Sequence, residues 1–113
     1  MADIVYVDEE DGKKRIMNNS KLYAKLLGKF RDDTKIEPIF DAINAGNLEE
    51  AHKLAHTVKG ITANLSIKDL NEKIVKLEAQ IKANSIEQGI AEEVRASFAA
   101  TLPEVERVIA ENA

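Results

Sequence analysis

The chain contains no cysteine and no tryptophan, and aromatic residues make up only 4% of its 113 residues. Without cysteine there is no disulfide framework, no thiolate nucleophile and no cysteine-ligated metal, and the composition is compatible with a reducing compartment. Ala, Leu, Ile, Glu and Lys dominate, so residues that favour helix outnumber residues that favour strand nearly everywhere. An all-α protein is therefore predicted.

Long apolar runs and concentrated positive charge are also missing. No segment approaches the roughly 18 apolar residues of a membrane span, and the opening MADIVYVDEEDGKK lacks the basic and apolar regions of a signal peptide. The net charge is −4 and Lys and Arg are scattered among the acids, so no basic face for nucleic acid is expected. We therefore expect a cytoplasmic protein with neither a membrane span nor a nucleic-acid partner.

What the chain does contain is the composition of one small globular domain. Hydrophobic residues make up 44% and charged residues 32%, and no internal repeat or Pro/Gly-rich linker divides the chain. A single domain over residues 1–113 is predicted. A monomer is the default expectation, because one compact helical core needs no second chain.

Apolar spacing and capping residues divide the first half of the chain into helices and short turns. Residues 3–7 are expected to be extended, and Asp8 to cap a short helix over residues 9–17. Residues 20–45 form one long helix or two, because Pro38 and the polar stretch RDDTK allow a break near residues 32–37. Gly46 suits the left-handed position that ends a helix.

Three further helices follow, each opened by a residue type that favours helix N-termini. They are predicted over residues 47–65, 66–83 and 86–112, with Asn47, Ser66 and Ser85 at their starts and a kink at Pro103. Short turns make successive long helices antiparallel neighbours. The predicted fold is an antiparallel up-down four-helix bundle with a short additional N-terminal helix.

One residue of the helix over 47–65 breaks its hydrophobic pattern. On a helical wheel, eight residues form a single core-facing stripe: Leu48, Ala51, Leu54, Ala55, Val58, Ile61, Thr62 and Leu65. His56 lies roughly 150° from the centre of this stripe, so its imidazole is expected to point into solvent. A neutral imidazole offers a ring lone pair, which makes His56 a candidate nucleophile toward phosphorus.

The predicted surface around His56 is open. Gly60 lies on the same outer face one turn later, where glycine costs about 1 kcal/mol relative to Ala, and Ala63 extends the row. Lys59 lies on the adjoining strip of helix, from which its ammonium can reach an anion on the ring. Because the chain lacks phosphate-binding loops and kinase signatures, the phosphoryl group must come from another protein.

These residues resemble the histidine-containing phosphotransfer (HPt) family. AHKLAHTVKGITANL is similar to the family signature, a histidine followed by Lys at plus three and Gly at plus four. The segment DGKKRIMNNSKLYAKLLGKF and the KLE at residues 76–78 are similar to the segments that flank it, so nearly the whole chain is covered. One departure is Ser66, which stands where the family usually has Gly after Asn-Leu.

The resemblance implies a phosphorelay intermediate with no turnover of its own, and not an enzyme. His56 would accept the phosphoryl group from a receiver-domain aspartate or a kinase and pass it to a response regulator. Lys59 would stabilise its charge, Gly60 would give the partner access, and Glu78 would hydrogen-bond the proximal ring nitrogen. The implied partners are response-regulator receiver domains and a sensor or hybrid histidine kinase. No cofactor is expected here, because the Mg²⁺ would belong to the receiver domain.

Further residues are predicted to contact the partner. Counting along antiparallel helices places Ile36 and Phe40 level with His56. The predicted docking set consists of His52, Lys53, Ala63, Asn64, Ile36, Phe40 and Lys76.

Two other interpretations are open. A helical adaptor that binds receiver domains without phosphorylation would use the same surface, although it has no need of a nucleophile beside a lysine. His52 and His56 also have the i, i+4 spacing of two metal ligands, but no third ligand is evident. Zinc-dependent melting that His52→Ala removes would indicate such a metal site.

Overall fold

The computed structural model describes residues 4–113, and all of their regular structure is helical, as predicted. No strand occurs within this range. Six helices follow one another along the chain: α1 Glu9–Lys14, α2 Ser20–Asp33, α3 Glu37–Asn44, α4 Leu48–Asn64, α5 Lys68–Lys82 and α6 Ile90–Asn112. None of them is both long and apolar enough to cross a membrane.

The predicted starts of α1 and α4 are confirmed. The side chain of Asp8 accepts a hydrogen bond from the Asp11 amide, and that of Asn47 accepts one from the Glu50 amide. Helix α1 is shorter than predicted, because Met17 has a φ of 59° and cannot continue it. Of the predicted extended segment 3–7, residue 3 lies outside the described range, and residues 4–7 form neither helix nor strand.

Residues 20–45 form two helices, with the break inside the predicted region. Helix α2 ends at Asp33, and residues 34–36 connect it to α3, whose first turn contains Pro38. Proline fits there because the first amides of a helix have no intrahelical acceptor. Gly46 follows α3 with a φ of 76°, the left-handed conformation predicted for it.

Ser66 does not open α5, contrary to the prediction. It has a φ of 56°, and its hydroxyl hydrogen-bonds Asp11 Oδ2 at 2.5 Å, so it belongs to the turn that ends α4. Helix α5 instead begins at Lys68, and its first amides are capped from far away in sequence. The Lys68 amide donates to the Tyr6 carbonyl at 3.0 Å, and the Asp69 amide donates to the Val5 carbonyl at 3.1 Å.

The predicted start of the last helix is also wrong. Helix α6 begins at Ile90 and not at residue 86, because Gly89 has a φ of 94° and interrupts any helix that would run through it. Ser85 is not its cap; the Ser85 amide donates to the Gln80 carbonyl at the end of α5. The helix then runs through Pro103 to Asn112.

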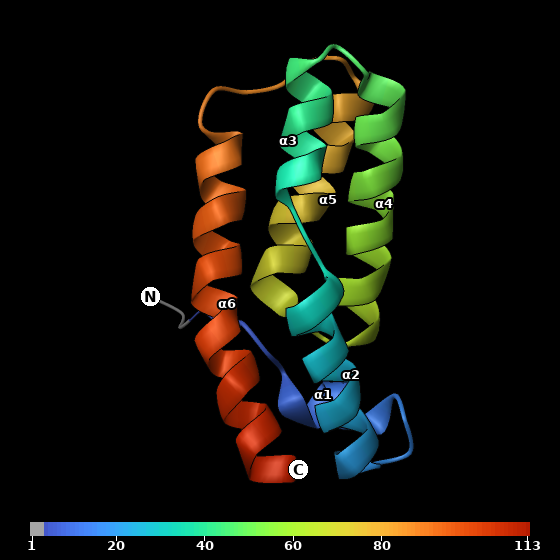
Figure 1. Ribbon diagram of the computed structural model, residues 1–113, viewed down its shortest axis with the longest axis vertical. Coiled ribbons are helices and arrows are strands. Elements are labelled where there is room, and N and C mark those ends of the chain that lie inside the picture. Colours follow the sequence, from blue (N-terminus) through green and yellow to red (C-terminus); the bar gives the residue numbers. More distant parts are fainter. Residues whose placement is uncertain (1–3) are drawn as a thin grey trace.

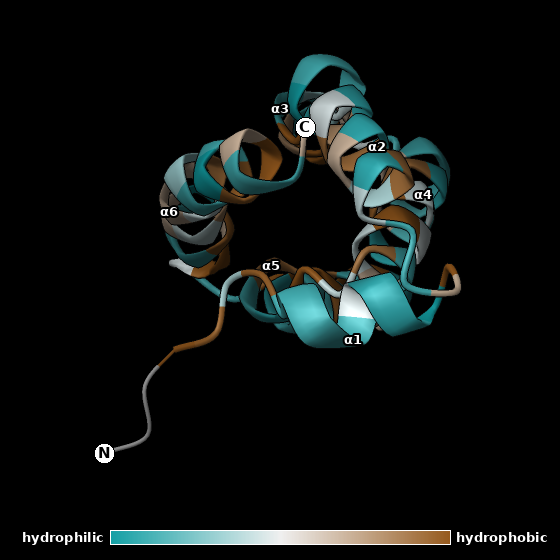
Figure 2. Cartoon of the chain, turned by 90° about the horizontal axis from the view of Figure 1, so that it is seen from below, coloured by the Kyte–Doolittle hydropathy of each residue, from teal (hydrophilic) through white to brown (hydrophobic). Residues whose placement is uncertain are grey.

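The long helices surround one core. Helix α4 packs against α5, α5 against α6, α6 against α2, and α3 against α4, so α2 and α3 together occupy the side between α6 and α4 (Figure 1). The hydrophobic faces of these helices turn inward (Figure 2). Fully buried side chains from α2, α3, α4, α5 and α6 fill the centre, among them Tyr23, Leu27, Ile39, Ala55, Leu70, Ile74, Leu77, Val94, Val105 and Val108.

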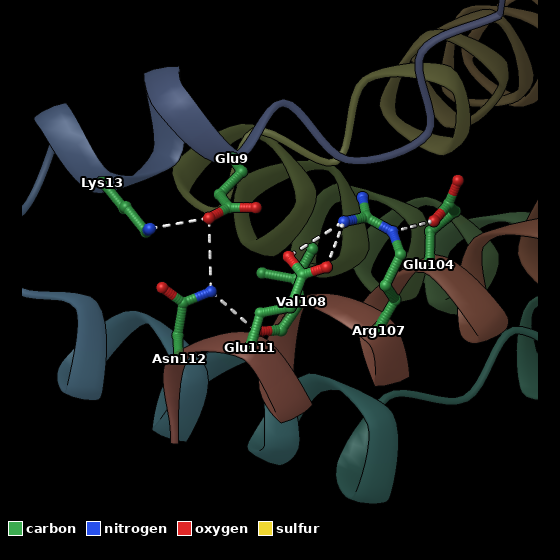
Figure 3. A network of polar contacts seen from close by, with 7 residues as sticks. All are labelled: Glu9, Lys13, Glu104, Arg107, Val108, Glu111 and Asn112. Atoms are coloured by element: carbon green, nitrogen blue, oxygen red, sulfur yellow. Dashed lines mark hydrogen bonds and ion pairs between the residues drawn. The ribbon is translucent and has the colours of Figure 1, made fainter.

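The short helix α1 is tied to the C-terminal end of α6. Asn112 donates to Glu9 at 3.2 Å and to the Val108 carbonyl at 2.7 Å, and Lys13 also pairs with Glu9 (Figure 3). The hydrogen bond from Lys13 is the main reason that the pKa of Glu9 lies below its usual value. These contacts close the end of the molecule that lies farthest from the α3–α4 turn.

Candidate functional site

Helix α4 places His56 on its outer face. Ala51, Ala55, Val58 and Thr62 are buried on the inner face, as the predicted stripe requires. The side chain of His56 is 67% exposed, so the prediction that it points into solvent is confirmed.

Glu78 on α5 contacts two of the candidate site residues of α4, His56 and Lys59. Its Oε2 lies 3.0 Å from Nδ1 of His56, and its Oε1 lies 2.5 Å from Nζ of Lys59. The antiparallel packing of α4 against α5 produces this convergence, because residues far apart in sequence become level across the two helices. The Glu78 side chain is only 13% exposed, whereas the imidazole that it holds is largely open.

The charge of Glu78 determines the tautomer of His56. Burial alone would raise the pKa of Glu78, but the hydrogen bonds from Lys59 and His56 outweigh burial and hold the pKa below its ordinary value. At neutral pH the group is therefore a carboxylate, which can only accept hydrogen bonds. We infer that the hydrogen of a neutral His56 ring is on Nδ1 and that the lone pair is on Nε2, for which residues 4–113 provide no hydrogen-bond partner.

The outer face of α4 beyond His56 is free of bulky side chains. A Cβ added to Gly60 would meet no atom of the described residues within 4 Å, so no packing within residues 4–113 requires glycine there. Ala63 and Asn64, one turn further, are exposed as predicted, and so is Lys53. The imidazole is therefore accessible to a large molecule that approaches along this row.

His52 lies one turn before His56 and shares its carboxylate. The two rings are nearly parallel, with centroids 6.2 Å apart and planes inclined by 20°. Nε2 of His52 is 3.9 Å from Glu78 Oε2, beyond hydrogen-bond distance. No group of three or more metal-ligating side chains is found in the part of the chain that the structure describes.

Three docking predictions need correction. Ile36 and Phe40 are only 4% and 5% exposed, so their side chains belong to the core and cannot form a partner surface. The ring of Phe40 also lies under the guanidinium of Arg95 on α6, at 4.7 Å. Lys76 is exposed but pairs with Glu93 on α6 at 3.5 Å; it lies about 200° around α5 from Glu78 and thus away from His56.

Sequence reasoning missed Asn71, which locks the register of α4 and α5. Its amide nitrogen donates to the Lys59 carbonyl at 3.1 Å and to Thr62 Oγ1 at 3.0 Å. Asn71 precedes Glu78 by seven residues, two helical turns, and a polar residue at that spacing was the available signal. The same contacts explain why Glu78 is level with His56 and not one turn away.

The chain matches no family model, no curated protein and no solved structure.

Proposed function

We propose that this chain is a histidine phosphotransfer protein of a two-component phosphorelay. The observation that carries the proposal is an exposed imidazole with one nitrogen bonded to a largely buried carboxylate and the other without a partner among residues 4–113. Such a ring is oriented and held in one tautomer, as carboxylate-paired histidines are at other working sites. Its free lone pair is the group that a phosphoryl acceptor needs.

In the proposed reaction, His56 Nε2 attacks the phosphorus of an aspartyl phosphate. The bond between phosphorus and the aspartate oxygen breaks, its electron pair leaves with the aspartate carboxylate, and a phosphohistidine forms. Glu78 keeps the Nδ1 hydrogen and stabilises the positive charge that develops on the ring. The reverse step passes the group to an aspartate of a second partner, so the chain has no turnover of its own.

The proposed partners are receiver domains of response regulators and a sensor or hybrid histidine kinase, and the receiver would supply the Mg²⁺. An apolar groove of about 770 Å³ between α2 and α4 supports a protein partner. Leu26, Phe30, Ile61 and Leu65 line it, and Ile61 follows Gly60 directly, so the groove adjoins the open row of α4. A partner that covers both would bury apolar surface while reaching His56.

The helix packing supports the finer fold proposal as well. In it, α2 and α3 together form one arm of an antiparallel four-helix bundle, α4, α5 and α6 form the others, and α1 covers one end. This arrangement needs no second chain, and a cytoplasmic monomer is part of the proposal.

The test is to incubate the purified protein with a phosphorylated receiver domain or a promiscuous histidine kinase and to map an acid-labile phosphoryl group by mass spectrometry. We expect label on His56 and only background label on His56→Gln, which should melt like the wild type because residue 56 is exposed. His52→Gln is the matched control and should be labelled on His56 like the wild type at pH 8. Undiminished labelling of His56→Gln would refute the assignment.

The groove between α2 and α4 also favours a second candidate, an adaptor that binds receiver domains without phosphorylation. If the protein is such an adaptor, the wild type and His56→Gln would bind a receiver domain equally well, and no competent donor would label either form.

A further inference from the structure

His52 is an ionisable group of the site that the proposed reaction does not use. Its side chain is 37% exposed, its ring stacks on that of His56, and its Nε2 faces the same carboxylate oxygen. Two imidazoles and one ammonium thus converge on the single negative charge of Glu78.

The charges around His52 come from two helices. On α4 its neighbours are Glu49, Lys53 and His56, and on α5 they are Glu78 and Lys82; Glu49, Lys53 and Lys82 line a shallow pocket together with His52. Helix α3 also packs against α4, but its acids Glu37 and Asp41 line another groove, beside Arg95 of α6.

The positive charge of Lys59 is already paired with Glu78 in this arrangement. Its Nζ lies 2.5 Å from Glu78 Oε1, so its charge is matched before any phosphoryl group arrives. A phosphoryl group adds a charge of about −1.5 to −2 at pH 7. Among the near neighbours of His56 on α4, His52 is the side chain that can gain a positive charge close to neutral pH.

We propose that phosphorylation of His56 is coupled to protonation of His52, so that the loaded protein takes up a proton one turn away from the phosphoryl group. This inference rests on the proposed phosphotransfer function. By linkage, if the phosphoryl group favours protonated His52, protonation of His52 favours the phosphorylated state equally. Acidification through the His52 titration therefore shifts the phosphoryl equilibrium from the partner aspartate toward His56.

Phosphoramidate provides a test without any partner protein. In its reaction with His56, the phosphorus–nitrogen bond of the reagent breaks, ammonia leaves, and Nε2 forms the new phosphorus–nitrogen bond with its lone pair. The chain has only two histidines, so the ring C–H resonances of both can be followed by NMR and assigned with His52→Gln.

We expect the titration midpoint of the His52 resonances to rise by about half a unit at low ionic strength when His56 is phosphorylated, which is the Coulomb effect of a charge of about −1.5 roughly 8 Å away in water. The rise should shrink in 0.5 M salt, because screening shortens the range of the interaction. Equal midpoints in the two states, within 0.1 unit, would overturn the coupling.

Substitutions give a second test, using the equilibrium loading of His56 by a phosphorylated receiver domain at pH 6 and pH 8. His52→Gln should lower loading at pH 6 about twofold to threefold and leave pH 8 unchanged, whereas His52→Lys should raise loading at pH 8 to the pH 6 value. Lys53→Gln, which removes an exposed charge on the same helix, should change the loading of His56 by the same factor at pH 6 and at pH 8. Equal pH responses in wild type and His52→Gln would refute the coupling.

The two proposals fail separately. If phosphoramidate and receiver domains both leave His56 unlabelled, the phosphotransfer function fails and the coupling fails with it. If His56 is labelled but the His52 titration does not respond, only the coupling fails.

Discussion

The corner where α1 meets the end of α4 and the outer face of α4 both combine a glycine with polar side chains, but for opposite reasons. At the corner, Gly12 leaves room for the ring of Tyr23, whose buried hydroxyl donates to the Leu65 carbonyl at 2.7 Å. On the outer face, no atom of residues 4–113 occupies the space beside Gly60, and within the same range one nitrogen of the nearby His56 has no partner. Features that internal packing does not explain are the ones that point to a partner molecule.

The largest effect on stability is expected at Gly12. We expect Gly12→Ala to lower the free energy of unfolding by about 3 kcal/mol, because the new methyl group would overlap the fully buried ring of Tyr23. Chemical denaturation measures this change. Gly28→Ala is the control, since its Cβ would make ordinary contacts at 3.8 Å or more, and it should not destabilise the protein. A stable Gly12→Ala would mean that the corner is loosely packed.

The hydroxyl of Tyr23 gives the next largest effect. Tyr23→Phe leaves the buried Leu65 carbonyl without its donor, which should cost about 1–2 kcal/mol of unfolding free energy. Burial also raises the pKa of Tyr23 well above its usual value, so the hydroxyl remains a donor in mildly alkaline solution. Thermal melts of Tyr23→Phe and wild type measure the loss; identical melts would show that the hydrogen bond contributes nothing.

On the open face, the corresponding change is Glu78→Ala. We expect phosphoryl transfer to His56 to slow by tenfold or more, because the ring loses the carboxylate that fixes its tautomer. Glu78→Gln is the matched variant: its amide oxygen can still accept from Nδ1, so it should retain most of the rate. NMR of the ring nitrogens should show Nδ1–H in the wild type and a mixture of tautomers in Glu78→Ala. Loss of the rate without a change of tautomer would contradict the proposed role.

The smallest expected effect is at Gly60, with the opposite sign to Gly12. Gly60→Ala should stabilise the protein by about 0.5–1 kcal/mol, because alanine favours helix and its methyl group enters open space. The longer side chain of Gly60→Gln should fold equally well but slow transfer from a receiver domain, which a labelling time course would measure. A wild-type rate for Gly60→Gln would contradict the idea that this face admits a partner.

The sequence predicted the local features of this molecule better than the distant ones. Asp8, Asn47 and Gly46 were placed correctly because a cap or a left-handed position depends on a few neighbouring residues. Ser66 and Ser85 are equally good cap residues, but the Ser66 side chain bonds Asp11, which is distant in sequence, and the Ser85 amide closes the end of α5 by donating to the Gln80 carbonyl.

The same division holds for the candidate site. The exposure of His56 follows from the pattern of one helix, and Glu78 was found through the family resemblance. That Lys59 binds Glu78 depends on how α4 and α5 pack, which the pattern of either helix alone does not contain. Ile36 and Phe40 were wrongly assigned because counting gives a height along the bundle and not the side on which a residue lies.

The carbonyls of Val5 and Tyr6, which cap the first amides of α5, give the molecule a built-in reporter of local opening. The helix that carries Glu78 begins on hydrogen bonds supplied from more than sixty residues earlier in the chain. The amides of Lys68 and Asp69 can exchange with solvent deuterium when that N-terminal segment detaches, even while the rest of the protein stays folded. Their exchange rates therefore measure how often the N-terminal segment detaches from α5, the helix whose Glu78 contacts the imidazole of His56.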